Sequence, residues 1–165
     1  MIVVDTNLVV ALLVTGPQRE LAESVFARDR QWEVPMLWRS EFRNVLALSV
    51  RHAGLALTAA ETYCSRAARL LADREHAVDD ATVLHLASAS GCTAYDCEFV
   101  ALAERLGVSL ITFDREVLAA FPATAIHPRQ FASGEFWGDR VSEQMAELYG
   151  AGASRRHRTR RRTAA

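Results

Sequence analysis

Lysine is absent from this chain of 165 residues, although arginine occurs 19 times. The absence excludes a Walker-type nucleotide site, because no GK[ST] run exists to hold phosphates. It also excludes a signalling receiver domain, which needs a lysine beside a phosphorylated aspartate. A phosphatase that forms an aspartyl-phosphate fits poorly, since Asn7 stands where such enzymes usually have a second aspartate.

Cysteine and long apolar runs are scarce as well. Three cysteines in all, without a paired CxxC spacing, predict reduced thiols rather than a disulfide framework or a zinc site. The longest apolar runs, such as residues 8–14, are far shorter than the roughly 20 residues of a membrane-spanning helix. The opening MIVVDTN lacks the basic and apolar regions of a secretory signal. We therefore expect a cytoplasmic protein without a membrane partner.

The net charge of −1 conceals a marked asymmetry. Six arginines lie within residues 155–162, and the rest of the chain carries 13 basic against 20 acidic side chains. An acidic body with a basic tail predicts acidic partners for the tail, such as RNA. We expect a folded domain over 1–132, a C-terminal helix or docking arm over 133–150, and a disordered Arg-rich tail over 151–165.

Strand and helix patterns alternate along the first 126 residues. Short apolar runs predict strands at 2–4, 33–35 and 109–113, with an edge strand at 123–126. Helical spacing predicts helices at 8–13, 18–30, 37–52, 58–72, 79–90, 96–106 and 114–121, with Thr58 and Glu61 as a capping box. This alternation is typical of a three-layer α/β/α sandwich around a mainly parallel sheet.

Four acidic residues lie where strands end or helices begin. Asp5 and Asp114 directly follow predicted strands, Glu41 lies in the first turns of its helix, and Asp96 begins another helix. In open parallel sheets, ligands bind beyond the carboxyl ends of the strands, where strand ends and helix starts meet. We therefore expect the four carboxylates to converge at one edge of the sheet.

The helix faces on which the acids lie favour a shared buried site. Asp96 continues the apolar stripe of Phe99 and Val100, and Glu41 shares a face with Val45 and Leu48. A buried, unpaired carboxylate costs several kcal/mol. Helix N-termini, protonation or a divalent cation would each offset that cost. The residues alone leave open whether the acids bind metal or are only helix caps and turn residues.

The acids supply oxygen ligands, and no His or Cys lies beside them at the spacing of a zinc site, which favours Mg²⁺ or Mn²⁺ over zinc. A divalent cation at such a site activates water for attack on a phosphodiester. Asn7 and Thr112 lie close to the acids in sequence and could orient them, although ordinary turn and strand hydrogen bonding explains both equally well.

Three segments resemble the PIN domain family over roughly residues 1–130. MIVVDTNLVVALL is similar to the family's opening, RSEFRNVL contains Glu41 where the family has its helical Glu, and AYDCEFVALAERLGVSLITFD is similar to the last two acidic segments. The resemblance implies that Asp5, Glu41, Asp96 and Asp114 are catalytic. It also implies that Asp5, Asp96 and Asp114 bind the metal ion, and Thr112 matches a small hydroxyl residue of the pattern.

The single-domain size resembles the VapC toxins of type II toxin–antitoxin pairs. That resemblance implies a Mg²⁺- or Mn²⁺-dependent endoribonuclease, a homodimer inhibited by a small antitoxin protein. Two alternatives remain: an RNA-processing nuclease of the same fold without an antitoxin, and a catalytically idle module that binds RNA or docks proteins. The Arg-rich tail is not part of the pattern.

Overall fold

The computed structural model describes residues 1–134, of which Met1–Ala132 group into one compact unit. The expected tail over 151–165, and the expected arm over 133–150 from residue 135 onward, lie outside the described residues. Among the described helices, none combines the length and the apolar character that a membrane span requires.

Five parallel strands form one sheet at the centre of this unit. The strands are β1 (Ile2–Val4), β2 (Trp32–Pro35), β3 (Glu75–His76), β4 (Leu110–Ile111) and β5 (Ala125–Ile126). Their order is β3-β2-β1-β4-β5, so β5 is an edge strand, as predicted, and β1 is central. The α/β/α architecture with a parallel sheet is therefore confirmed.

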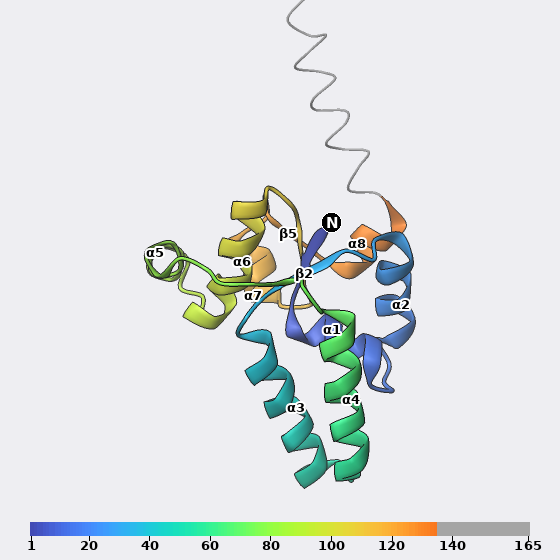
Figure 1. The fold of residues 1–165 in the computed structure, drawn as a ribbon. Helices are drawn as coiled ribbons and strands as arrows, with labels where there is room; N and C mark the ends of the chain where they lie inside the picture. Colours follow the sequence, from blue (N-terminus) through green and yellow to red (C-terminus); the bar gives the residue numbers. More distant parts are fainter. Residues whose placement is uncertain (135–165) are drawn as a thin grey trace, which may run out of the picture. The chain divides into compact units, whose positions relative to one another are not determined.

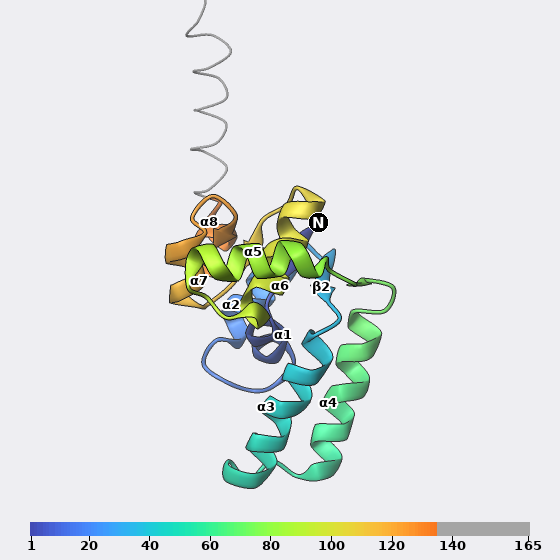
Figure 2. The same cartoon turned by 90° about the vertical axis from the view of Figure 1, so that its left-hand side faces the viewer.

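Helices cover both faces of the sheet (Figure 1). Those described are α1 (Thr6–Leu13), α2 (Arg19–Arg28), α3 (Trp38–His52), α4 (Leu57–Leu70), α5 (Asp80–Ser90), α6 (Ala94–Leu106), α7 (Arg115–Ala120) and α8 (Pro128–Ser133). Helix α6 packs on β1, β2 and β4, and α5 packs on α6. In Figure 1 these two lie on one side of the strands and α1 and α2 on the other. Helices α3 and α4 pack together and extend away from the sheet (Figure 2).

The central strand is apolar because helices cover both of its faces. Ile2, Val3 and Val4 are each at most 3 % exposed. Helix α6 is buried on several sides for the same reason, with Cys97, Val100 and four other residues in the core. This packing fixes the two elements whose ends carry Asp5 and Asp96.

The sequence patterns missed strand β3, because Glu75 and His76 are polar and lack the apolar run of a strand. Hydrogen bonds and ion pairs between charged side chains hold β3 in place instead. The buried Glu33 carboxylate accepts a hydrogen bond from Arg74 (2.8 Å) and bonds the His76 ring (2.8 Å). Glu75 pairs with Arg39 on α3 (2.6 Å). These pairs join residues at least 36 positions apart, which no local pattern reveals.

The predicted capping box at Thr58 and Glu61 is wrong. Helix α4 begins at Leu57, and its N-cap, Ala56, makes no side-chain hydrogen bond. A true capping box lies instead at the start of α6, between Thr93 and Asp96. A threonine followed three residues later by an acid occurs at both places. Only Thr93, however, lies at the N-cap position of its helix.

Candidate active site at the carboxyl edge of the sheet

Strands β1 and β4 bring the first and the last acid together. β1 pairs with β2 on one side and with β4 on the other, so the chain order reverses between β1 and β4. Such a topological switch point opens a crevice at the carboxyl ends of the strands. The register pairs Val4 with Ile111, so Asp5 and Thr112 are the next residues on adjacent strands. The Thr112 hydroxyl donates to Asp5 Oδ2 at 2.6 Å.

Asp5 and Asp114 are also helix N-caps, which is the capping role that the sequence left open for the acids. Asp5 Oδ1 accepts from the backbone N–H of Leu8 at 2.7 Å. Asp114 Oδ1 accepts from the N–H groups of Glu116 (2.8 Å) and Val117 (3.0 Å). Capping uses only one oxygen of Asp114; its Oδ2 has no hydrogen-bond partner within residues 1–134. The cap therefore orients the carboxylate and leaves an oxygen available for a ligand.

Glu41 and Asp96 are fixed by threonines. Glu41 Oε2 accepts from the Thr6 hydroxyl at 2.5 Å, which ties α3 to the start of α1. Asp96 Oδ2 accepts from the Thr93 hydroxyl at 2.6 Å and from the Thr93 N–H at 3.2 Å. Both carboxyl groups therefore hold a defined position, and each is only half-buried.

The predicted buried face of α3, which joined Glu41 with Val45 and Leu48, is wrong in detail. Its buried face consists of Trp38, Phe42 and Leu46, whereas Leu48 is 44 % exposed. Glu41 therefore lies at the flank of the buried face, rotated towards α1. This rotation places its carboxylate at the rim of the crevice, within reach of Thr6.

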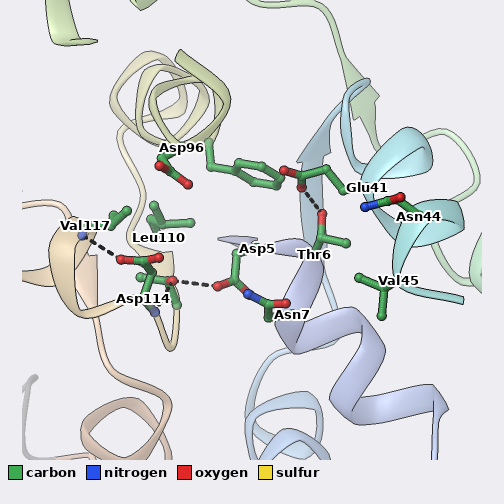
Figure 3. Close-up of a pocket in the computed structure, with 12 residues that line it drawn as sticks. Asp5, Thr6, Asn7, Glu41, Asn44, Val45, Asp96, Leu110, Asp114 and Val117 are labelled. Carbon is green, nitrogen blue, oxygen red and sulfur yellow. Dashed lines mark hydrogen bonds between the residues drawn. The ribbon is translucent and has the colours of Figure 1, made fainter. Parts of the chain in front are cut away.

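One cavity of about 210 Å³ at this edge is lined by all four acids. In Figure 3, Asp5 lies between Asp114 from the start of α7 and Glu41 from α3, with Asp96 above them. The remaining lining residues include Asn7 and Thr112, the two supporting residues expected from the sequence, as well as Thr6, Asn44, Val45, Phe99, Leu110 and Val117. The structure thus brings every sequence-predicted site residue to one cavity.

Burial and mutual repulsion govern the charge of this cavity. Burial raises the pKa of Asp5 to about 6, although hydrogen bonds from Thr112, Leu8 and Phe113 act in the opposite direction. The negative charge of Glu41 adds to the increase. The pKa of Glu41 is likewise raised by burial and by Asp96, against the Thr6 hydrogen bond. Such perturbed carboxyl groups in a cleft are typical of functional sites.

Glu98 extends this acidic field beyond the cavity. The sequence places it on a different helix face from Asp96, and it does not line the cavity. It is nevertheless half-buried, and its pKa is raised by burial and then by Glu41 and Asp80. Acidic side chains of α3, α5 and α6 therefore repel one another next to the crevice.

The donor atoms in the cavity fit a hard divalent cation. The polar lining atoms belong to carboxylate, amide and hydroxyl groups, and no His or Cys lines the cavity. Oxygen donors of this kind suit Mg²⁺ or Mn²⁺, and a cation would offset the burial and the repulsion that raise the pKa values of Asp5 and Glu41. Within residues 1–134, however, no three acidic, His or Cys side chains already stand close enough to hold an ion. Direct ligands would therefore be few, and water would complete the coordination, as Mg²⁺ commonly requires.

Two lining residues were missed by the sequence patterns. Thr6 lies between Asp5 and Asn7, and the sequence gives no sign that it pairs with Glu41, 35 positions away. Asn44 lies three positions after Glu41, so both occupy neighbouring places on one helix face. That spacing is the signal that could have identified Asn44.

Solved structures share this fold. FitAcB from Neisseria gonorrhoeae aligns with a TM-score of 0.63 at 20 % identity, over 78 % of this chain and 98 % of the other. FitAB bound to the IR36 DNA fragment aligns with a TM-score of 0.62 at 20 % identity, over 78 % of this chain and 95 % of the other. At this identity the likeness concerns the fold. No curated protein gives a significant sequence match.

The family comparison is more specific. The PIN domain family model matches residues 2–123, a span that contains all four acids and every strand except β5. PIN domains are generally nucleases, which supports a hydrolytic activity on phosphodiester bonds. With this match over most of its length, and with acids gathered at the carboxyl edge of a parallel sheet, the chain belongs to the PIN domain family.

Proposed function

We propose that this protein is a metal-dependent endoribonuclease that hydrolyses RNA phosphodiester bonds and is the toxin of a VapBC-type pair. One observation carries the proposal: Asp5, Glu41, Asp96 and Asp114 line one cavity at the switch point of the sheet. The choice of RNA rests on the resemblance of the single-domain size to that of the VapC toxins. An RNA-processing enzyme would use the same chemistry without an antitoxin.

In this proposal Asp5, Asp96 and Asp114 hold Mg²⁺ or Mn²⁺, in part through bound water. The cation would supply Lewis-acid activation of water and of the scissile phosphodiester. Thr112 keeps Asp5 in place through the bond to Oδ2 and also accepts from the Asp114 N–H at 2.9 Å. One hydroxyl thereby sets the spacing of two acids. Asn7, which is exposed at the cavity, would orient water among them.

Glu41 is suited to accept a proton from the attacking water. Its Oε2 is held by Thr6, and its Oε1 has no hydrogen-bond partner within residues 1–134. Its raised pKa makes the carboxylate a stronger base than an exposed Glu. As the water oxygen forms a bond to phosphorus, its proton passes to Oε1, and the bond to the leaving ribose oxygen breaks.

An antitoxin and a second copy of the chain are the expected protein partners. Helices α3 and α4 offer a mainly apolar groove lined by Leu46, Val50 and Leu57, of which Leu57 is 63 % exposed. We assign this groove to an amphipathic helix of the antitoxin, because such helices place their apolar face in grooves of this kind. Co-purification with the product of a small adjacent gene would support the assignment. Loss of that co-purification in Leu57→Asp would show that the antitoxin binds in this groove.

The decisive experiment compares RNA cleavage by the native protein and Asp96→Asn with Mg²⁺, with Mn²⁺ and with EDTA. We expect EDTA to abolish cleavage. We expect the substitution to lower kcat/KM at least about a hundredfold, a loss of about 2.7 kcal/mol of transition-state stabilisation. The amide keeps the size of the side chain, so thermal unfolding should show a folded variant.

Two controls define the outcome. Glu104→Gln removes a charge from an exposed position of α6 that lines neither the acidic cavity nor the α3–α4 groove, and should leave cleavage unchanged. Single-stranded DNA of the same sequence tests the choice of RNA. Cleavage that persists in EDTA, or an Asp96→Asn variant with native kcat/KM, would refute the mechanism. Equal cleavage of DNA would refute the substrate.

A further inference from the structure

A second cavity, of about 460 Å³, lies beside the acidic one. Thr112 and Asp114 line the acidic cavity, whereas Phe113 between them lines the second cavity. This division follows from extended backbone, in which successive side chains point to opposite sides. The Phe113 N–H also donates to Asp5 Oδ2 at 3.4 Å. The two cavities therefore share a wall that belongs to the active site itself.

The second cavity is lined by aromatic and cationic side chains, which are groups suited to a nucleotide. Phe113 and His127 form an edge-to-face pair, with ring centroids 5.8 Å apart and planes at 80°. Arg129 lines the same cavity, and its guanidinium makes no ion pair or hydrogen bond within residues 1–134. Unpaired bases stack on aromatic side chains, and arginines bind phosphates. The volume is within the range of small-molecule sites.

The tautomer of His127 is fixed by the backbone. The Arg129 N–H donates to His127 Nδ1 at 3.1 Å, so Nδ1 is unprotonated and Nε2 carries the hydrogen. Burial, and then the charge of Arg129, lower the pKa of His127, which keeps the ring neutral near pH 7. A neutral ring with a fixed Nε2–H is a directed donor for a base or sugar oxygen.

Sheet topology explains why these residues lie here. Phe113 follows β4 and His127 follows β5, and the two strands are parallel neighbours. Their carboxyl ends therefore meet at the same edge as that of β1. Gln18, the N-cap of α2, and Glu20 in its first turn also line the cavity. Glu20 is the one acidic residue among the lining residues, so it opposes an anionic ligand.

We propose that this second cavity binds the nucleotide next to the cleaved bond of the RNA strand, with its base against Phe113 and His127 and a phosphate at Arg129. This inference rests on the proposed function, which identifies the bound strand as RNA. The substrate is thereby a single strand, because a base must be unstacked to enter. Cleavage would then prefer particular bases at this one position.

The test measures binding of small probes to the full-length Asp96→Asn protein in EDTA. The probes are the four nucleoside monophosphates, ribose 5-phosphate and inorganic phosphate. NMR follows the His127 ring protons, identified among the five histidines by their loss in His127→Gln. We expect at least one nucleoside monophosphate to shift the His127 signal and to bind more tightly than ribose 5-phosphate, because only the nucleotide supplies a base.

Two charge changes test the orientation of the ligand. Arg129→Gln should weaken nucleotide binding about tenfold, since it removes a charge-assisted hydrogen bond. Glu20→Gln should strengthen binding, because it removes a repelling charge. Arg66→Gln on α4 is the matched control: it changes the same charge on an exposed arginine that lines neither cavity, and should leave binding unchanged.

The outcomes separate this inference from the proposed function. If no nucleotide shifts the His127 signal, or if Arg129→Gln binds as Arg66→Gln does, the nucleotide site is refuted even when the protein cleaves RNA. Native KM values for Arg129→Gln in the active enzyme would refute it too. Conversely, nucleotide binding by a protein that does not cleave RNA would support the site and refute the proposed nuclease.

Discussion

Asp5 combines two roles that conflict energetically. Its carboxylate caps α1 and accepts from Thr112, so it is well placed to hold a cation. The residue is only 9 % exposed, however, and burial raises its pKa to about 6. Without a bound cation, the ionised form therefore destabilises the fold. Functional sites often hold groups that would be more stable elsewhere.

The pH dependence of stability should reveal this conflict. Because the folded pKa of Asp5 exceeds the ordinary value of 3.8, its favourable contribution is complete below pH 3.8 and is lost as pH rises through about 6. Relative to Asp5→Asn, which does not titrate, the native free energy of unfolding should fall by about 3 kcal/mol across this window. Denaturant unfolding in EDTA at several pH values measures the difference. A constant difference would contradict the prediction.

Helix α6 shows how one element serves both stability and the site. Its N-terminal capping box uses Asp96, the same residue that lines the acidic cavity. The helix cannot fray at this end without displacing a carboxylate of the site. Helix α4, which has no side-chain cap, lies outside that cavity and has no such constraint.

Thr93→Ala should therefore have two effects. Loss of the cap should cost about 1 kcal/mol of stability. Because Asp96 also loses the 2.6 Å bond that holds its Oδ2, kcat should fall while KM for RNA changes little. Denaturant unfolding and steady-state cleavage measure the two effects.

Thr58→Ala is the matched control, since Thr58 is exposed and its side chain caps nothing. It should change stability by less than about 0.5 kcal/mol and leave cleavage unchanged. Equal effects of the two alanine variants on kcat would show that the cap does not position Asp96.

At the scale of the whole molecule, the proposed substrate carries the same sign of charge as most of the chain. The chain outside residues 155–162 carries a net charge of −7, and RNA is a polyanion. Arginines at the nucleotide cavity and in the C-terminal segment would oppose this repulsion. The substrate would then be attracted by groups separate from those that cleave it.

A chain that ends at residue 153 tests the contribution of the C-terminal arginines. In the Asp96→Asn background, RNA binding by the shortened chain should be weaker at low salt and converge with that of the full chain at high salt. Each lost phosphate contact should reduce the slope of log K against log salt by about 0.7 for a single strand. Fluorescence anisotropy at several salt concentrations measures both quantities, and equal slopes would contradict the prediction.

The sequence by itself determined the parallel α/β fold and the placement of acids at strand ends and helix starts. Both follow from short-range patterns: the apolar run before Asp5, the SLITF strand before Asp114, and the helical stripe behind Asp96. Only the tertiary structure decided the order of the strands, the existence of β3, the tilt of Glu41 towards Thr6, and the cavity beside Phe113. These depend on contacts between residues tens of positions apart, whose partners are selected by packing and charge pairing rather than by local propensity.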